Sequence, residues 1–257
     1  MKIGLAATTL SLVFLMIACE TSEENINPTN KISTSTSTTP NTTTPPTTTT
    51  VKPSSQEIYD AFVRLALKNS TGTAQSTIRK WLPSKAQIKI YWDGGRTTAL
   101  FTALDKVITD MNSLNKFNKM VRTEAVAEAD IIINRVDAAT HNSKYASFQV
   151  SNSSVQGTTF TQWTSDAIVK AIVWLSPTTP ANLQNGVLRH ELTHALGIGH
   201  TENTKSIMIP VISNNNYDFN SFSILDQRVI QILSDNRVKQ GHTEASISAV
   251  IKEYAAK

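Results

Sequence analysis

Residues 190–200 read HELTHALGIGH and carry the strongest structural signal in this chain of 257 residues. On a helix, His190 and His194 are four residues apart and project from one face, so both imidazoles can bind one metal ion. Glu191 is rotated by about 100° from His190. Its carboxylate is therefore expected beside the metal, where it can accept a proton from a water molecule.

Gly197 and His200 complete the pattern within the same stretch. Glycine can enter the left-handed conformation that ends a helix, and the chain can then turn sharply and return His200 as a third ligand. A surface helix with incidental histidines would explain one or two of these residues, but not the glycine and the third histidine at these offsets. Three imidazoles with an open fourth position are typical of a catalytic zinc ion rather than of a structural one.

The stretch fits HExxHxxGxxH at all five fixed positions and resembles the metzincin clan of zinc metallopeptidases. Metzincins carry a turn with a methionine beneath the zinc. Residues 206–208 (SIM) resemble that turn, since Met208 follows His200 by eight residues. The sequence Met-Ile-Pro at 208–210 is most similar to matrixins, in which a proline-containing wall of the S1′ pocket follows the turn. The resemblance covers roughly residues 85–240 and is specific over residues 190–210.

The resemblance implies an α/β zincin-like fold, with a twisted, mostly parallel sheet, one antiparallel edge strand, the HExxH helix and a C-terminal helical subdomain. It also implies a zinc-dependent endopeptidase that hydrolyses peptide bonds of extracytoplasmic proteins. His190, His194 and His200 would hold one catalytic Zn²⁺ through Nε2, with water at the fourth position. Glu191 would be the general base for that water, and Met208 would support the site from below without binding the metal.

The chain departs from matrixins between residues 137 and 163. Matrixins have a loop there that is rich in glycine and aspartate and carries a second zinc and calcium ions. This stretch holds one glycine and one histidine, so a single zinc ion is expected. His141 and His242 stand alone in the sequence and are interpreted as solvated side chains rather than as ligands.

Hydrophobic periodicity predicts a chain of alternating helices and strands. Thr179 is the predicted cap of the metal-binding helix, with Pro180 at its first position. The alternating residues 145–151 are the candidate antiparallel edge strand that would line a substrate cleft, with an exposed hairpin as the alternative. The tryptophans Trp92, Trp163 and Trp174 are expected in the core. Helices are predicted over 55–69, 76–82, 98–114, 179–196, 225–233 and 244–254, and strands over 87–92, 120–126, 131–136 and 168–175.

The N-terminus predicts an exported and tethered protein. Residues 1–18 have a short positive start and an apolar stretch, which is too short to span a membrane, and they resemble a bacterial lipoprotein signal. Cys19 would be lipidated and would anchor the chain in the cell envelope, at the outer membrane or the cell surface. An ordinary secretory signal or an uncleaved anchor is the alternative. Residues 19–53, rich in threonine and proline, would form a disordered tether, and residues 54–257 the metallopeptidase domain.

Charge and composition limit the partners. The formal net charge is +4, and lysine and arginine are scattered rather than clustered, so no nucleic acid is expected. The expected partners are a polypeptide substrate and, through the lipid anchor, a membrane, with the protein as a monomer. The alternative is a surface binding or adhesion lipoprotein that keeps the metzincin fold without protease activity, although Glu191 would then have no use. A third interpretation, an inhibitor or immunity-type lipoprotein, predicts no metal.

Overall fold

The computed structural model describes residues 13–20, 52–68, 77–150, 155–210 and 221–257. Within these residues, the chain forms an α/β fold with a mostly parallel seven-stranded sheet in the order β1-β6-β7-β5-β3-β4, with β2 paired to β7. The strands are β1 (Val13–Glu20), β2 (Lys80–Trp81), β3 (Gln87–Gly94), β4 (Lys119–Arg122), β5 (Ile131–Arg135), β6 (Val155–Thr164) and β7 (Ala167–Leu175). The helices are α1 (Ser55–Ala66), α2 (Thr98–Leu114), α3 (Ala138–Lys144), α4 (Ala181–His194), α5 (Ile224–Leu233) and α6 (Glu244–Ala255), with a 3₁₀ turn at Val126–Glu128.

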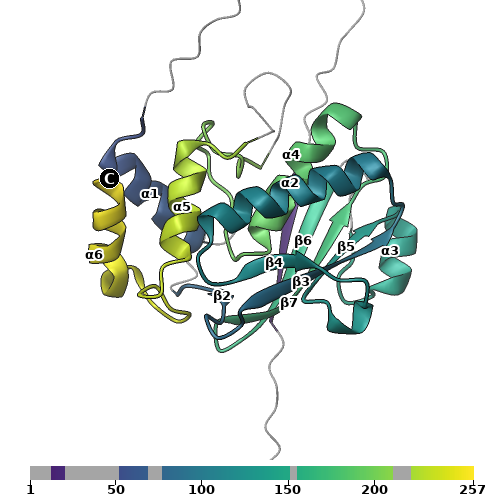
Figure 1. The fold of residues 1–257 in the computed structure, drawn as a ribbon, viewed down its shortest axis with the longest axis horizontal. Coiled ribbons are helices and arrows are strands. Elements are labelled where there is room, and N and C mark those ends of the chain that lie inside the picture. The colour runs from purple at the N-terminus through teal and green to yellow at the C-terminus, as the bar shows by residue number, and fades with distance from the viewer. Residues whose placement is uncertain (1–12, 21–51, 69–76, 151–154, 211–220) are drawn as a thin grey trace, which may run out of the picture.

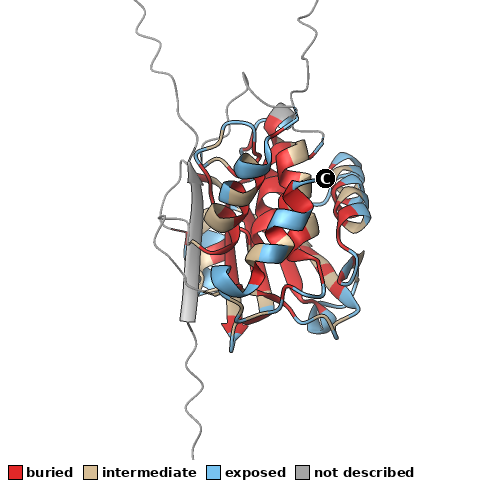
Figure 2. Cartoon of the chain, turned by 90° about the vertical axis from the view of Figure 1, so that its left-hand side faces the viewer, coloured by how far each residue is buried: buried red, intermediate tan, exposed pale blue. Residues whose placement is uncertain are grey.

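The helices divide unequally between the two faces of the sheet (Figure 1). Helices α2 and α4 lie along one face, and α1, α5 and α6 pack together at one end of the molecule. The main hydrophobic core lies between the sheet face that α2 and α4 cover and the helices α1, α2, α4, α5 and α6, as the buried residues in Figure 2 show. A smaller core on the other face, beside α3, includes Phe160, Ile172 and Trp174. The central strand β5 begins with three buried isoleucines, as expected for a parallel strand that is covered on both sides.

Local sequence explains most helices. Ser54 caps α1 and forms a capping box with Glu57, and both residues lie at the start of the predicted helix 55–69. Helix α2 matches the predicted range 98–114 and buries an apolar face that includes Leu100, Leu104 and Met111. The predicted start of α4 is wrong by one position. Its N-cap residue is Pro180, and the Thr179 hydroxyl donates instead to the Ser176 carbonyl oxygen at 2.9 Å.

The predicted helix at 76–82 is wrong in its described part, residues 77–82, because Lys80–Trp81 form strand β2. This short strand pairs in parallel with the start of β7. The Trp81 side chain is buried, and its Nε1 donates to the Ala195 carbonyl oxygen at 2.8 Å. Pairing with β7 and the burial of Trp81 therefore override the local helical pattern.

The predicted edge strand at 145–151 is also wrong. Residues 145–150 form no strand, and the antiparallel strand beside β7 is β6, ten residues long. β6 and β7 are joined by a two-residue turn in which Ser165 and Asp166 both have positive φ, at 48° and 63°. Positive φ at both turn residues matches the twist of a hairpin, but the sequence Ser-Asp lacks the glycine or asparagine that usually predicts such a turn.

Strand β1 extends the sheet beyond β6. It pairs antiparallel with β6 and places Cys19 opposite Gly157. Most of the predicted signal peptide and tether, residues 1–12 and 21–51, lies outside the described residues. In the described part of the chain, no helix combines the length and the apolar character needed to cross a membrane.

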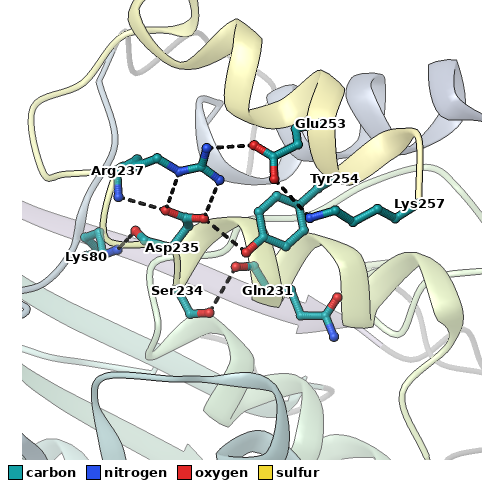
Figure 3. Close-up of polar contacts among 8 residues, drawn as sticks. All are labelled: Lys80, Gln231, Ser234, Asp235, Arg237, Glu253, Tyr254 and Lys257. Carbon is teal, nitrogen blue, oxygen red and sulfur yellow. Dashed lines mark hydrogen bonds and ion pairs between the residues drawn. The ribbon is translucent and has the colours of Figure 1, made fainter.

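A polar network fixes the end of α5 against β2 and α6 (Figure 3). The buried Lys80 donates through Nζ to the carbonyl oxygen of Val238 at 2.8 Å. Asp235 accepts from the Tyr254 hydroxyl at 3.0 Å and from the Arg237 guanidinium at 2.8 Å. Burial lowers the pKa of Lys80 to about 8. These contacts hold the end of α5 in place.

Candidate metal centre

Helix α4 and the turn that follows it bring three histidines together. His190 and His194 lie on α4, which ends at His194. Gly197 has φ +95°, and a Cβ on it would lie 2.1 Å from the Arg79 carbonyl oxygen. Glycine is thus required here both by its conformation and by the close approach of the chain. The turn returns His200, and the ligand nitrogens of His190, His194 and His200, hereafter the His triad, lie within 4.8 Å of one another.

Hydrogen bonds determine which nitrogen of each helical histidine faces the centre. Nδ1 of His190 donates to the Ile207 carbonyl oxygen, and Nδ1 of His194 donates to the Ile198 carbonyl oxygen, each at 2.6 Å. A carbonyl oxygen only accepts, so each Nδ1 carries the hydrogen and each Nε2 presents a lone pair. This is the arrangement in which the outer nitrogen is oriented by a carbonyl and the inner one is free to bind a metal.

The three Nε2 atoms of the His triad are separated by 2.9, 3.1 and 3.2 Å. The lone pairs of His190 and His194 cannot form a hydrogen bond with each other, since neither Nε2 carries a hydrogen. Tetrahedral ligands at 2.0–2.1 Å from one ion would be about 3.3 Å apart, close to these separations. The residues therefore fit a single tetrahedral cation with an open fourth position.

The His triad is buried, with exposed fractions of 0% for His190, 1% for His194 and 2% for His200. Burial lowers the pKa of His190 to about 4 and that of His200 to about 3, and it holds the pKa of His194 well below its usual value. All three imidazoles are therefore neutral at pH 7. Neutral imidazole is the form that binds a metal ion.

Glu191 lies on α4 beside the triad and is fully buried. One carboxylate oxygen, Oε2, accepts from the Thr159 hydroxyl of β6 at 2.7 Å. The other, Oε1, has no hydrogen-bond partner among the described residues. Burial raises the pKa of Glu191 to about 8, and the Thr159 hydroxyl acts in the opposite direction. The site thus combines a convergent set of imidazoles with a carboxylate that has an oxygen available as a proton acceptor.

A turn at residues 206–208 supports one histidine of the triad. Met208 is buried. The Ile207 carbonyl oxygen accepts from His190, and the Ile207 N–H donates to Oδ2 of Asp226 on α5 at 3.1 Å. The Ser206 hydroxyl donates to Oδ1 of Asp226 at 2.5 Å. This buried carboxylate therefore links α5 to the turn, and through the turn to a metal-ligand candidate.

The lone histidines of the sequence lie elsewhere. His242 is half-buried, and its Nδ1 accepts from the Lys239 N–H. The interpretation of His141 as solvated is wrong, because the side chain is fully buried on α3. Its ring nitrogens lie 2.9 Å from Asn134 Oδ1 and 2.8 Å from the Phe148 carbonyl oxygen. His141 packs the smaller core, and the isolation of a histidine in sequence gave no signal of that burial.

A family model described as a protein of unknown function, DUF2927, matches residues 55–253. The chain belongs to the DUF2927 family. The match runs from α1 into α6, so the His triad, Glu191, the 206–208 turn and Asp226 all lie inside the DUF2927 region. No curated protein matches the sequence.

Three residues of this DUF2927 site were missed by sequence reasoning. Thr159 and Gly157 lie on β6, the strand that was not predicted, and they contact Glu191 from a distant part of the chain. Asp226 lies in a helix that was predicted, but its contact with residues 206 and 207 is tertiary. One local signal does exist for Asp226, because Ser223 and Asp226 form a capping box at the start of α5.

Proposed function

We propose that this protein is a zinc-dependent endopeptidase with a metzincin-like fold. The observation that supports this most strongly is the convergence of three Nε2 atoms, 2.9–3.2 Å apart, beside a buried carboxylate. One oxygen of this carboxylate has no hydrogen-bond partner within the described part of the chain. A metal site that only stabilised the fold would close the fourth position with another side chain. Among the described residues, three candidate ligands form this group, and Glu191 accepts a hydrogen bond from Thr159 instead of joining them.

The chain's own residues have separate roles in this mechanism. The His triad holds the ion through Nε2, and the Ile207 and Ile198 carbonyl oxygens fix two of the rings. A bound zinc ion supplies Lewis-acid activation of a water molecule and of the scissile carbonyl. Glu191 Oε1 accepts a proton from the attacking water and returns it to the leaving amine. Beside a cation, the Glu191 carboxylate favours its charged form, which opposes the rise in pKa that burial causes.

The edge of strand β6 is the proposed binding place of a peptide substrate. The edge of β6 already accepts β1 as an antiparallel strand, with Ile17 opposite Thr159 and Cys19 opposite Gly157. A substrate that paired there in place of β1 would run past the two residues that contact Glu191. Backbone pairing of this kind binds extended peptides with little dependence on sequence. Addition of a strand at this edge therefore favours an endopeptidase over an enzyme that acts on small molecules.

We also propose that the domain works at the cell envelope, held there by lipidated Cys19. The apolar stretch before Cys19 and the threonine- and proline-rich segment after it support this location. Metabolic labelling with a clickable fatty acid tests it. Wild type should carry the label and Cys19→Ser should not, whereas an unlabelled and correctly cleaved wild type would mean ordinary secretion.

The function is tested with the protein from Ser54 onward, by elemental analysis and by cleavage of casein. Wild type should hold one zinc ion per chain and cleave casein. His194→Ala should lose both zinc and cleavage, while Glu191→Gln should keep zinc and lose cleavage. Two tightly bound zinc ions, or none, would overturn the site. A zinc-loaded wild type that cleaves no protein or peptide would instead point to a binding protein with this fold.

A further inference from the structure

Strand β6 forms a specific cradle for the Glu191 carboxylate, built by two residues. Thr159 is fully buried, and its hydroxyl lies 2.7 Å from Glu191 Oε2 and 2.9 Å from the Glu191 carbonyl oxygen. Gly157 lies two positions earlier on the same face of the strand, next to Oε1 and Cγ of the Glu191 side chain. A Cβ on Gly157 would be 2.6 Å from Glu191 Oε1 and 2.7 Å from Glu191 Cγ. No side chain other than hydrogen therefore fits at this position without moving Glu191.

The two contacts treat the two carboxylate oxygens differently. Oε2 is held by a hydroxyl donor, whereas Oε1 lies over the glycine and has no hydrogen-bond partner among the described residues. A free glutamate side chain rotates about three bonds. Such rotations move the carboxylate or interchange its two oxygens, so that neither oxygen stays in place to accept the proton. Here the strand itself is fixed by its ladder with β7, in which Thr159 is opposite Val173. The cradle is therefore a rigid support for the side chain.

We propose that Thr159 is a positioning residue for the general base. Its hydroxyl holds Oε2 and so keeps Oε1 as the oxygen that exchanges the proton, while Gly157 provides the space for this orientation. The inference rests on the proposed function, because Glu191 must act as a base for its orientation to affect turnover. A general base held in one orientation loses less entropy on the way to the transition state, so the effect belongs to kcat rather than to binding.

A purely structural role for Thr159 makes a different prediction. The hydroxyl also bonds the Glu191 backbone, so its loss can loosen the contact between β6 and α4. That loss would lower the thermal stability and leave kcat unchanged. Thr161 provides a matched control, since it is also buried and lies on the same face of β6, two residues further along.

The experiment compares Thr159→Val, Thr159→Ser and Thr161→Val in the zinc-loaded protein. Valine keeps the shape of threonine and removes the hydroxyl. Thr159→Val should lower kcat by roughly 10- to 100-fold, with KM and zinc content close to those of wild type. Thr159→Ser should restore most of kcat, and Thr161→Val should resemble wild type. Wild-type kcat in Thr159→Val, equal losses in Thr161→Val, or no rescue by serine would each overturn the proposal.

A crystal structure of zinc-loaded Thr159→Val separates this proposal from the proposed function. The Glu191 carboxylate should turn away from its wild-type orientation in the variant, even if wild type proves to have no peptidase activity. If wild type is inactive, the proposed function fails, and the crystal structure still decides whether Thr159 orients Glu191. An unchanged carboxylate in the variant would overturn the positioning role.

Discussion

Replacement of Asp226 should weaken zinc binding, although Asp226 is not a ligand. Its carboxylate is buried and accepts from the Ser206 hydroxyl at 2.5 Å, the Ile207 N–H at 3.1 Å and the Ser223 hydroxyl at 2.7 Å. Ile207 thus contacts both sides: its N–H donates to Asp226, and its carbonyl oxygen accepts from His190 Nδ1 at 2.6 Å. Loss of the carboxylate therefore releases the support that fixes one imidazole of the His triad.

The size of the effect follows from these contacts. Asp226→Leu leaves the buried Ile207 N–H without its acceptor, at a cost of about 1–3 kcal/mol, and removes hydrogen bonds to a charged group worth about 1.5–3 kcal/mol. A total loss of about 3–5 kcal/mol is expected. Asp226→Asn keeps one acceptor oxygen, so about 1–2 kcal/mol is expected. Groups that orient metal ligands typically change affinity by about 10- to 100-fold, and we expect about 10-fold for Asp226→Asn.

Competition with a chelator measures the zinc affinity, and thermal unfolding with and without zinc measures the coupled stability. A 10-fold weaker affinity reduces the stabilisation by excess zinc by about 1.4 kcal/mol. Asp235→Asn is the matched control, because Asp235 is also buried, just beyond the other end of α5, and bonds Tyr254 and Arg237. It should lower the melting temperature and leave zinc affinity unchanged. Equal zinc affinities in the two variants would refute the link from Asp226 to His190.

Three further predictions concern the turn, the smaller core and pH. Gly197→Ala should destabilise the protein by about 2–4 kcal/mol and abolish zinc binding, because φ is +95° and the Arg79 carbonyl oxygen occupies the Cβ position; urea unfolding and elemental analysis check this. His141→Leu should cost about 1–3 kcal/mol in urea unfolding, since the oxygen that accepts from the neutral, buried ring loses its donor, but should leave kcat unchanged. The metal-free protein should lose stability as pH falls below about 6.5, because the unfolded chain then protonates histidines whose pKa burial lowers in the fold. Each histidine lowers the free energy of unfolding by about 1.4 kcal/mol per pH unit. The raised pKa of Glu191 acts in the opposite direction and cancels the contribution of one histidine. A free energy of unfolding that stays constant between pH 7 and 5 would contradict this prediction.

Elements with a strong local pattern could be predicted from the sequence. The long amphipathic stretch of α2 and the capping box of α1 each specify a helix without reference to distant residues. The same holds for the histidine-rich stretch, because the helical spacing and the glycine turn act within eleven residues. The left-handed φ of Gly197 confirms the predicted turn, and the convergence of the three ring nitrogens follows from it.

Strand β6 could not be predicted in the same way. Thr158, Thr159 and Thr161 are buried, yet threonine counts as polar in an alternating pattern, so the strand does not show a buried face. Threonine is nevertheless suited to strands, since its branched Cβ packs well on a pleated surface. The contacts of Thr159 and Asp226 also join segments far apart in the chain, 32 residues in the case of Thr159 and Glu191. No local signal specifies such pairs.

The buried His triad connects metal binding to folding. Folding places three neutral imidazoles, of which His190 and His194 turn lone pairs toward each other, beside a carboxyl group whose pKa is raised, and both features oppose the folded state. A cation at the centre reverses both costs, since it satisfies the lone pairs and favours the charged form of Glu191. The supports that fix the site come from the β6 strand and from α5, through the 206–208 turn. Zinc binding should therefore stabilise the contacts of β6 with α4 and of α5 with the 206–208 turn, and not α4 alone.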